Sequence, residues 1–258
     1  MTTVQEIINY FESFAPLCTA MDFDNCGLIV GDARLCVKKA LLALDITSEV
    51  VCEAAQKGCE LIISHHPVIF QPIKRLGTAS VPYLLAQKGI AALCMHTNLD
   101  LGESFGVNIC LGRAAGLDEV KRADCGDALF FGTLPKEIGT EELAKRVKAN
   151  LGCEGLRYTE GKGTVKKVAV SSGAGGSDIF AAAEIGADAL ITGEIKHHEL
   201  NAANELKIAV IDAGHFKSED IVINPLTEML RAKFPETEFT KSQTYSDKVK
   251  YLIKSRFL

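Results

Sequence analysis

Two kinds of segment alternate along this chain, and their alternation most restricts its fold. Short apolar runs that end in turn residues are followed by longer segments with the apolar spacing of a helix. The short runs have the length of buried strands, and the longer ones that of helices. Strands that alternate with helices build parallel sheets in which helices form the crossovers. The sequence therefore predicts an α/β fold with a largely parallel sheet or sheets.

The expected elements lie on both sides of a change in pattern near residues 126–140. Before it, we predict strands over 40–46, 61–64 and 90–95, and helices over 3–14, 47–58, 81–88 and 104–115. After it, we predict strands over 128–131, 168–172, 189–192 and 208–212, and helices over 141–150, 178–185, 195–205 and 218–233. A polar, extended tail completes the chain.

Composition excludes several classes of protein. The formal net charge of −5 argues against a large nucleic-acid surface, which requires clustered Lys and Arg. No apolar run approaches the roughly 20 residues of a membrane-spanning helix. The first basic residue is Arg34, so the start of the chain lacks the pattern of a secretory signal or transit peptide, and we expect a cytoplasmic protein. The nine cysteines contain no Cys-x-x-Cys pair, which is typical of reduced thiols.

The six histidines occur in four short stretches, and three of these follow predicted strands. His65 and His66 follow the strand over 61–64, and His96 follows the strand over 90–95. His215 follows the strand over 208–212. Because open α/β sheets bind ligands at the carboxyl ends of their strands, we expect these three stretches to meet in one site.

The residue types in these stretches favour a metal centre. Imidazole and carboxylate together suit Zn, Mn, Fe, Co or Ni, whereas Ca and Mg prefer oxygen alone. His215 and Glu219 have the spacing that places two side chains on one helix face, and Asp100 follows His96 by the same spacing. His65 and His66 point to opposite sides if they are extended, so they can serve two ions. A bridged two-metal site is expected, with Glu219 or Asp100 as the bridge. The alternative is a set of unrelated polar residues that cap helices.

Several segments resemble one known family. They are Ser64-His65-His66-Pro67-Val68-Ile69-Phe70, the run from His96 to Asp100, the run from Gly214 to Glu219, Asp24-Asn25-Cys26-Gly27-Leu28, and the run from Ala187 to Glu194. In this order they are similar to the signatures of the GTP cyclohydrolase 1 type 2 homologues, also described as dinuclear metal-centre proteins.

The resemblance implies two interlocked α/β lobes with mixed, largely parallel sheets, two divalent metal ions per subunit, and a toroidal homohexamer. The implied metal ligands, with Glu219 shared by both ions, are His65, His66, Asp100, His215 and Glu219. Since the last two follow the second lobe yet must return to the first, we expect a metal-binding lobe of 1–126 with 213–258 and a second α/β lobe of 127–212. The inserted domain of longer family members is absent, and Lys217-Ser218 departs from the residues often found between the last two ligands.

The resemblance does not make His96 a standard ligand, and we expect it to be catalytic, in proton transfer or substrate contact; otherwise it is a hydrogen-bond partner of the site. His197 and His198 fit either a solvated helix face or a second binding site. The turn Gly173–Gly176 fits either a tight strand-to-helix connection or an anion cradle.

The leading hypothesis for function is a metal-dependent hydrolase that acts on a nucleotide or a related small molecule. Opening of the GTP ring as its reaction is implied by the resemblance alone. The main alternative is a non-catalytic metal-binding oligomeric scaffold or regulator. A weaker one is a regulator that binds a nucleotide at the glycine turn.

Overall fold

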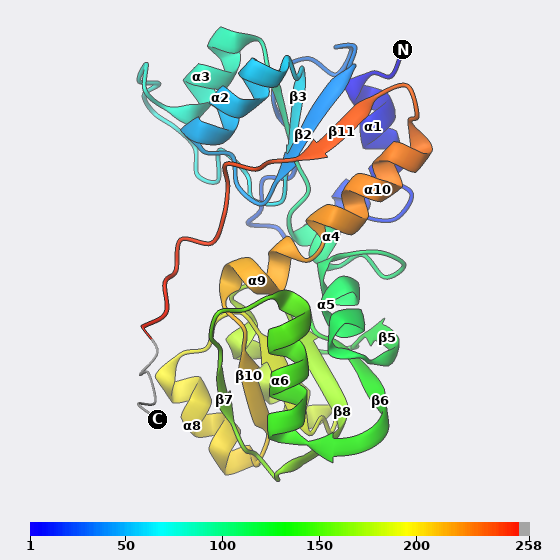
Figure 1. Cartoon of the computed structure of the whole chain (residues 1–258), viewed down its shortest axis with the longest axis vertical. Coiled ribbons are helices and arrows are strands. Elements are labelled where there is room, and N and C mark those ends of the chain that lie inside the picture. Colours follow the sequence, from blue (N-terminus) through cyan, green and yellow to red (C-terminus); the bar gives the residue numbers. More distant parts are fainter. Residues whose placement is uncertain (253–258) are drawn as a thin grey trace, which may run out of the picture. The chain divides into compact units, whose positions relative to one another are not determined.

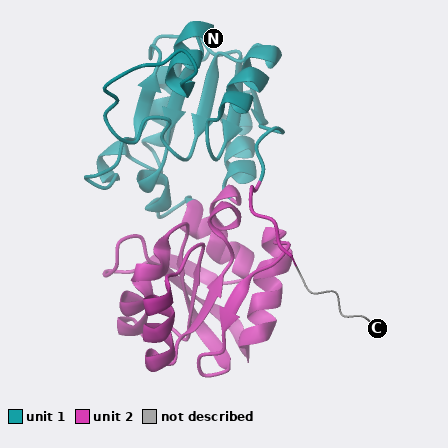
Figure 2. Cartoon of the chain, turned by 90° about the vertical axis from the view of Figure 1, so that its left-hand side faces the viewer, with its two compact units in different colours: residues 1–106, 222–246 teal, residues 107–221, 247–258 magenta. Residues whose placement is uncertain are grey.

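The computed structural model describes residues 1–252, which form two compact units (Figures 1 and 2). Unit 1 contains Met1–Gly106 and Val222–Ser246, and unit 2 contains Val107–Ile221 with the segment from Asp247. The chain therefore passes between the units three times. Each unit has its own mixed sheet with helices around it, which confirms the expected α/β fold of two interlocked lobes.

Unit 1 is built on a five-stranded sheet with the strand order β1-β4-β3-β2-β11. All neighbouring strands are parallel except β1, which is antiparallel to β4. The strands are β1 Gly27–Val30, β2 Lys39–Ala43, β3 Leu61–Ser64, β4 Ala91–Cys94 and β11 Glu238–Lys241. The three strands predicted in this unit form its centre.

The helices of unit 1 cover both faces of its sheet, with α2 and α3 on one and α1 and α10 on the other (Figure 1). They begin and end where local chemistry dictates: Thr3 and Glu6 form a capping box at α1, and Gly58 ends α2 in the left-handed conformation. The helices are α1 Val4–Phe11, η1 Leu17–Thr19, α2 Ser48–Lys57, α3 Val81–Lys88, α4 Thr97–Asp100 and α10 Ile223–Lys233.

Unit 2 is built on a six-stranded sheet with the strand order β5-β6-β8-β9-β10-β7. The three central strands, β8, β9 and β10, are parallel, and the other pairs are antiparallel. The strands are β5 Asp118–Arg122, β6 Phe130–Gly139, β7 Arg157–Thr159, β8 Thr164–Ser171, β9 Ala189–Thr192 and β10 Ala209–Asp212.

Two hydrophobic clusters lie on the two faces of this second sheet. Val168 and Val170 of β8 belong to one of them, and Ala169 between them belongs to the other. This alternation is the two-residue period of a strand that is buried on both faces. The helices that supply the rest of the clusters, or connect the strands, are α5 Val107–Ala115, α6 Thr140–Leu151, η2 Gly175–Asp178, α7 Ile179–Glu184, α8 His197–Leu206 and α9 His215–Asp220.

The units divide the chain at positions different from the expected lobes. Residues 107–126 belong to unit 2 because α5 packs on α6 and β5 pairs with β6. Residues 213–221 also belong to unit 2, since α9 packs on α5.

One expectation near the end of the chain is corrected. The helix expected over 218–233 is two helices, α9 and α10. Pro225 lies in the first turn of α10, where it has no N–H to donate to the carbonyl of Ile221 and its ring clashes with that carbonyl, so one continuous helix cannot run through this point. The polar tail expected to be extended includes β11, a strand that pairs in parallel with β2. Among residues 1–252, no helix combines the length and the apolar character needed to cross a membrane.

Candidate metal centre

In unit 1, the carboxyl ends of three parallel strands lie side by side. Ala43 of β2 is level with Ser64 of β3, and Ser64 is level with Cys94 of β4. The residues that follow these strands include Asp45, the His65-His66 pair and His96. The first two predicted histidine stretches therefore meet at one sheet edge, as expected.

Three imidazoles gather at this edge. One nitrogen from each of His65, His66 and His96 lies within 4.8 Å of the others. The rings are 5.0 to 5.4 Å apart, measured between centroids. Asp100, the last residue of α4, places Oδ1 at 3.6 Å from Nε2 of the buried His65. Nitrogen and oxygen donors in this mixture suit a borderline divalent cation.

Each of these imidazoles is held through its Nδ1 atom. Nδ1 of His65 donates to the carbonyl oxygen of Met95 at 2.9 Å. The carboxylates of Asp45 and Asp24 accept from Nδ1 of His66 and His96, both also at 2.9 Å. Because a carbonyl or carboxylate oxygen is an acceptor, the Nδ1 atoms carry the protons, and in the neutral ring Nε2 carries the lone pair that can bind a metal.

Asp24 connects the first motif of the sequence to this cluster. Besides His96, its carboxylate accepts hydrogen bonds from the backbone N–H of Thr97 at 3.0 Å and the thiol of Cys26 at 2.9 Å. Burial opposes ionisation, but the hydrogen bonds from His96, Cys26 and Thr97 outweigh it and hold the pKa of Asp24 well below its usual range. Asp24 is thus a carboxylate that fixes the orientation of His96.

In unit 2, a second pair of donors lies beside the parallel strands. Ser171, Thr192 and Asp212, the last residues of β8, β9 and β10, are level with one another. Helix α9 follows β10 and carries His215 and Glu219. Nε2 of His215 lies 3.0 Å from Oε2 of the buried Glu219, as their spacing on one helix face predicts.

His215 is also held through Nδ1, which contacts Oε1 of Glu194 at 2.8 Å. Glu194 follows β9 and belongs to the matched run from Ala187 to Glu194, although no role was predicted for it. Asp24 and Asp45 were also not predicted. The signal for all three was present, because each follows a turn or strand end near the predicted site residues. In four histidines of two different units, Nδ1 therefore has an oxygen acceptor.

Two glycines allow α9 to lie against the strand ends of unit 2. A Cβ atom at Gly173 would stand 2.1 Å from Oε1 of Glu219, and one at Gly193 would stand 2.8 Å from Cα of His215. Farther along the same turn, a Cβ at Gly176 would stand 2.5 Å from Oε2 of Glu199. Side chains of the protein fill the space beside Gly173–Gly176, which favours the tight connection over the anion cradle.

The sequence led us to expect that all three histidine stretches meet at the strand ends of one sheet, and the structure corrects this reason. Strands β3 and β4 belong to the sheet of unit 1, whereas β10 belongs to the sheet of unit 2. A common sheet edge therefore does not join His215 to His65 and His96. His197 and His198, in the first turn of α8, are exposed, as on a solvated helix face.

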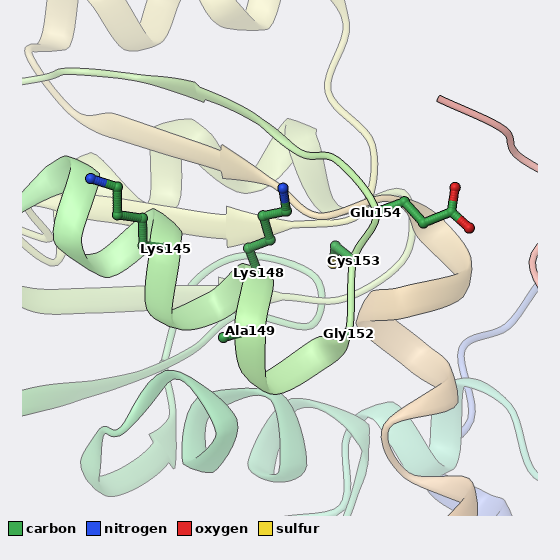
Figure 3. Close-up of a pocket in the computed structure, with 6 residues that line it drawn as sticks. All are labelled: Lys145, Lys148, Ala149, Gly152, Cys153 and Glu154. Carbon is green, nitrogen blue, oxygen red and sulfur yellow. The ribbon is translucent and has the colours of Figure 1, made fainter. Parts of the chain in front are cut away.

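A hollow of about 430 Å³ at the carboxyl end of α6 contains none of the predicted site residues (Figure 3). Its side chains offer little chemistry: Lys145 is paired with Glu141, and burial raises the pKa of the Cys153 thiol. The residues that line it are Lys145, Lys148, Ala149, Gly152, Cys153 and Glu154.

Comparison with known proteins agrees with the resemblance seen in the motifs. A GTP cyclohydrolase 1 type 2 homolog of Clostridium perfringens is 31% identical over 264 residues, which cover 96% of this chain and 99% of that protein. A protein of the same description from Clostridium acetobutylicum is 35% identical over 234 residues, covering 84% of this chain and 85% of that one.

Solved structures show the same fold over nearly the whole chain. The crystal structure of a Staphylococcus aureus hypothetical protein matches with a TM-score of 0.88 at 26% identity, covering 97% of this chain and 99% of that one. Reduced HcgD from Methanocaldococcus jannaschii matches with a TM-score of 0.81 at 29% identity, covering 94% and 98%. Residues 2–248 match the family described as Duf34/NIF3 (NGG1p interacting factor 3). The chain is a member of the Duf34/NIF3 family.

Proposed function

We propose that this protein binds two divalent metal ions and hydrolyses a nucleotide or a related small molecule. The observation that carries the proposal is the set of histidines held through Nδ1, three of them by carboxylates. Protein carboxylates commonly orient metal-binding imidazoles in this way, because the hydrogen bond fixes the ring and makes Nε2 more basic. The proposed ligands, with Glu219 as the bridge, are His65, His66, Asp100, His215 and Glu219.

The donors fit zinc, manganese, iron, cobalt or nickel better than calcium or magnesium, since imidazoles outnumber carboxylates. When bound, two such ions would lower the pKa of a water molecule and polarise the bond that it attacks. The chain's own contribution is to hold its donors in fixed orientations. We assign His96 a catalytic role, because Asp24 fixes its ring and leaves Nε2 to exchange a proton with the substrate.

The nucleotide substrate is supported by the description of the clostridial relatives as GTP cyclohydrolase 1 type 2 homologs. Hydrolytic opening of a purine ring is a reaction that a two-metal site can perform, because the attacked carbon and the leaving nitrogen both need charge stabilisation. We propose GTP as the first substrate to test. The cytoplasmic location remains a prediction.

The test combines metal content with turnover. Purified protein is stripped with a chelator, reloaded with Mn or Zn, and assayed for loss of the guanine absorbance of GTP and of other nucleotides. We expect about two ions per chain and a turnover that chelation abolishes. The double variant His65→Ala, His215→Ala should lose both, whereas His197→Ala, His198→Ala, a matched pair on an exposed helix face, should keep both. Metal content and activity unchanged in the first variant would overturn the proposal.

The same experiment separates hydrolysis from a non-catalytic metal-binding scaffold or regulator. A scaffold would bind the ions and lose thermal stability on chelation, because a ligand that binds only the folded state stabilises it. Such a scaffold would convert no nucleotide, whichever metal ion it was loaded with. That outcome would keep the metal centre and remove the hydrolase.

A further inference from the structure

We propose that the segment Ser242–Tyr245, which follows β11, is a positioning element for the metal ligand His66 and acts through Asp45. The inference rests on the proposed metal centre. It assigns a role to Asp45 and Tyr245, which belong neither to the proposed ligand set nor to the sequence motifs.

The contact path begins at a tyrosine hydroxyl. Oη of Tyr245 donates to Oδ2 of Asp45, which lies 200 positions earlier in the sequence. The other oxygen of the same carboxylate, Oδ1, accepts from Nδ1 of His66 at 2.9 Å. Asp45 therefore has one oxygen for the histidine and one for the tyrosine, and two bonds in different directions define the plane of its carboxylate.

Backbone hydrogen bonds bring Tyr245 to this position. Strand β11 pairs in parallel with β2, and Lys241 lies level with Leu42. The pairing continues one residue beyond the strand, where the N–H of Ser242 donates to the carbonyl of Leu42 at 2.7 Å. Since Asp45 follows the same strand β2, the end of β11 carries the segment toward it.

Glu53 of α2 fixes the residues between Ser242 and Tyr245. Its carboxylate, which is 6% exposed, accepts from the hydroxyls of Ser242 at 2.6 Å and Thr244 at 2.9 Å, and from the N–H of Gln243 at 3.1 Å. The ring of Tyr245 then packs against the hydrophobic cluster that α2 forms with β2 and β3. A buried carboxylate with this many donors has one arrangement, so the tyrosine hydroxyl is delivered to a defined place.

His66 differs from the other two imidazoles of unit 1 in how it is held. A backbone carbonyl holds His65, and Asp24, which receives several further hydrogen bonds, holds His96. The side chain of Asp45 is 35% exposed, so water can compete for its oxygens. The Tyr245 hydroxyl donates to the second oxygen of Asp45, and its loss should make it easier for the carboxylate to rotate away from His66. Loss of such an outer-shell partner typically weakens metal binding about 10- to 100-fold.

The test measures cobalt binding rather than turnover. Chelator-stripped protein is titrated with Co²⁺, and the visible absorption reports both affinity and ligand geometry. In Tyr245→Phe we expect one of the two cobalt equivalents to bind roughly 10- to 100-fold more weakly, with a changed spectrum. Asp45→Asn should weaken the same equivalent at least as much, and Asp45→Glu should restore part of the affinity. Tyr10→Phe is the matched control, because it deletes a hydroxyl from a tyrosine of the same unit that packs on Phe14 and Phe234.

A second variant separates positioning from loss of folding. Glu53→Gln leaves Asp45 and Tyr245 unchanged but weakens the anchor of the segment, so it should also weaken that cobalt equivalent. Thermal unfolding of the metal-free variants shows which of them fold. Wild-type affinity and spectrum in folded Tyr245→Phe and Glu53→Gln would overturn the inference. If the wild-type protein itself bound no cobalt, the proposed function would fail instead, and the two failures are distinguishable.

Discussion

Asp24 illustrates how much a single carboxylate can organise around a site. Its two oxygens serve His96, Thr97 and Cys26. In Asp24→Asn, one acceptor oxygen becomes an NH₂ group that faces donors, and we expect a loss of about 1–3 kcal/mol in the free energy of unfolding. Urea denaturation measures it. In the proposed hydrolase, kcat should also fall more than KM changes.

The control for this change is Asp22→Asn, two positions away on the exposed surface. Because nothing buried depends on that side chain, its free energy of unfolding should stay within about 0.5 kcal/mol of the wild type. Equal losses in the two variants would mean that the hydrogen bonds of Asp24 contribute nothing specific.

Glu53 makes the stability of the protein depend on acid pH. Burial opposes its ionisation, but hydrogen bonds from Lys57, Ser242, Gln243 and Thr244 lower its pKa from 4.5 to about 2. Because the pKa is lower in the folded state, the stabilisation is complete above pH 4.5 and is lost as the pH falls through 2. The shift corresponds to an upper limit of about 3 kcal/mol.

We therefore expect the difference in free energy of unfolding between wild type and Glu53→Gln to be largest near pH 6 and to shrink toward pH 2. Urea unfolding at both pH values tests this. A difference that grew as the pH fell would contradict the assignment of the low pKa to Glu53.

At the scale of elements, the way in which α9 places its Glu219 side chain depends on a glycine. Gly173 has φ +57° and its missing Cβ leaves room for Glu219. In Gly173→Ala the methyl group would overlap the carboxylate of Glu219, so this side chain must leave its position beside His215. We expect a loss of stability larger than in Gly186→Ala, where φ is +70° and nothing lies within 4 Å. Thermal unfolding temperature and metal content are measured for both glycine variants. If both variants behaved alike, the close contact between Gly173 and Glu219 would have no effect of its own.

Local sequence predicted the central elements well because their signals are local. The runs over 61–64 and 189–192 are strands with those bounds, and Thr47 caps α2 through the N–H of Val50. The strands β5, β7 and β11 were missed because they are polar and are defined by the strand beside them. Strand β1 was missed although its residues Leu28 to Val30 form an apolar run. Pro225 was a readable signal for the break between α9 and α10.

The site residues, too, could be predicted where their signal is local in the sequence. His65, His66 and His96 come together in unit 1 because adjacent parallel strands end level with one another, and His215 with Glu219 follows helix spacing. Asp45 could have been found, since it lies near the end of the strand predicted over 40–46. Tyr245 could not, because its contact with Asp45 depends on the pairing of β11 with β2.

At the scale of the whole molecule, the resemblance implies a toroidal homohexamer. We expect light scattering after size-exclusion chromatography to give six times the 27.8 kDa of one chain. Measuring the mass before and after chelation shows whether metal is needed for assembly. A monomer or dimer at micromolar concentration would contradict the prediction.

The threefold passage of the chain between its units has a consequence for synthesis on the ribosome. Residues 107–221, nearly all of unit 2, emerge before the last strand of unit 1, and domains begin to fold as they emerge. Until β11 arrives, one edge of β2 lacks its partner strand, and exposed edges invite wrong pairing. The nascent protein can thus fold most of unit 2 before the sheet of unit 1 is complete, and the hydrogen bond from Tyr245 to Asp45 is among the last to form.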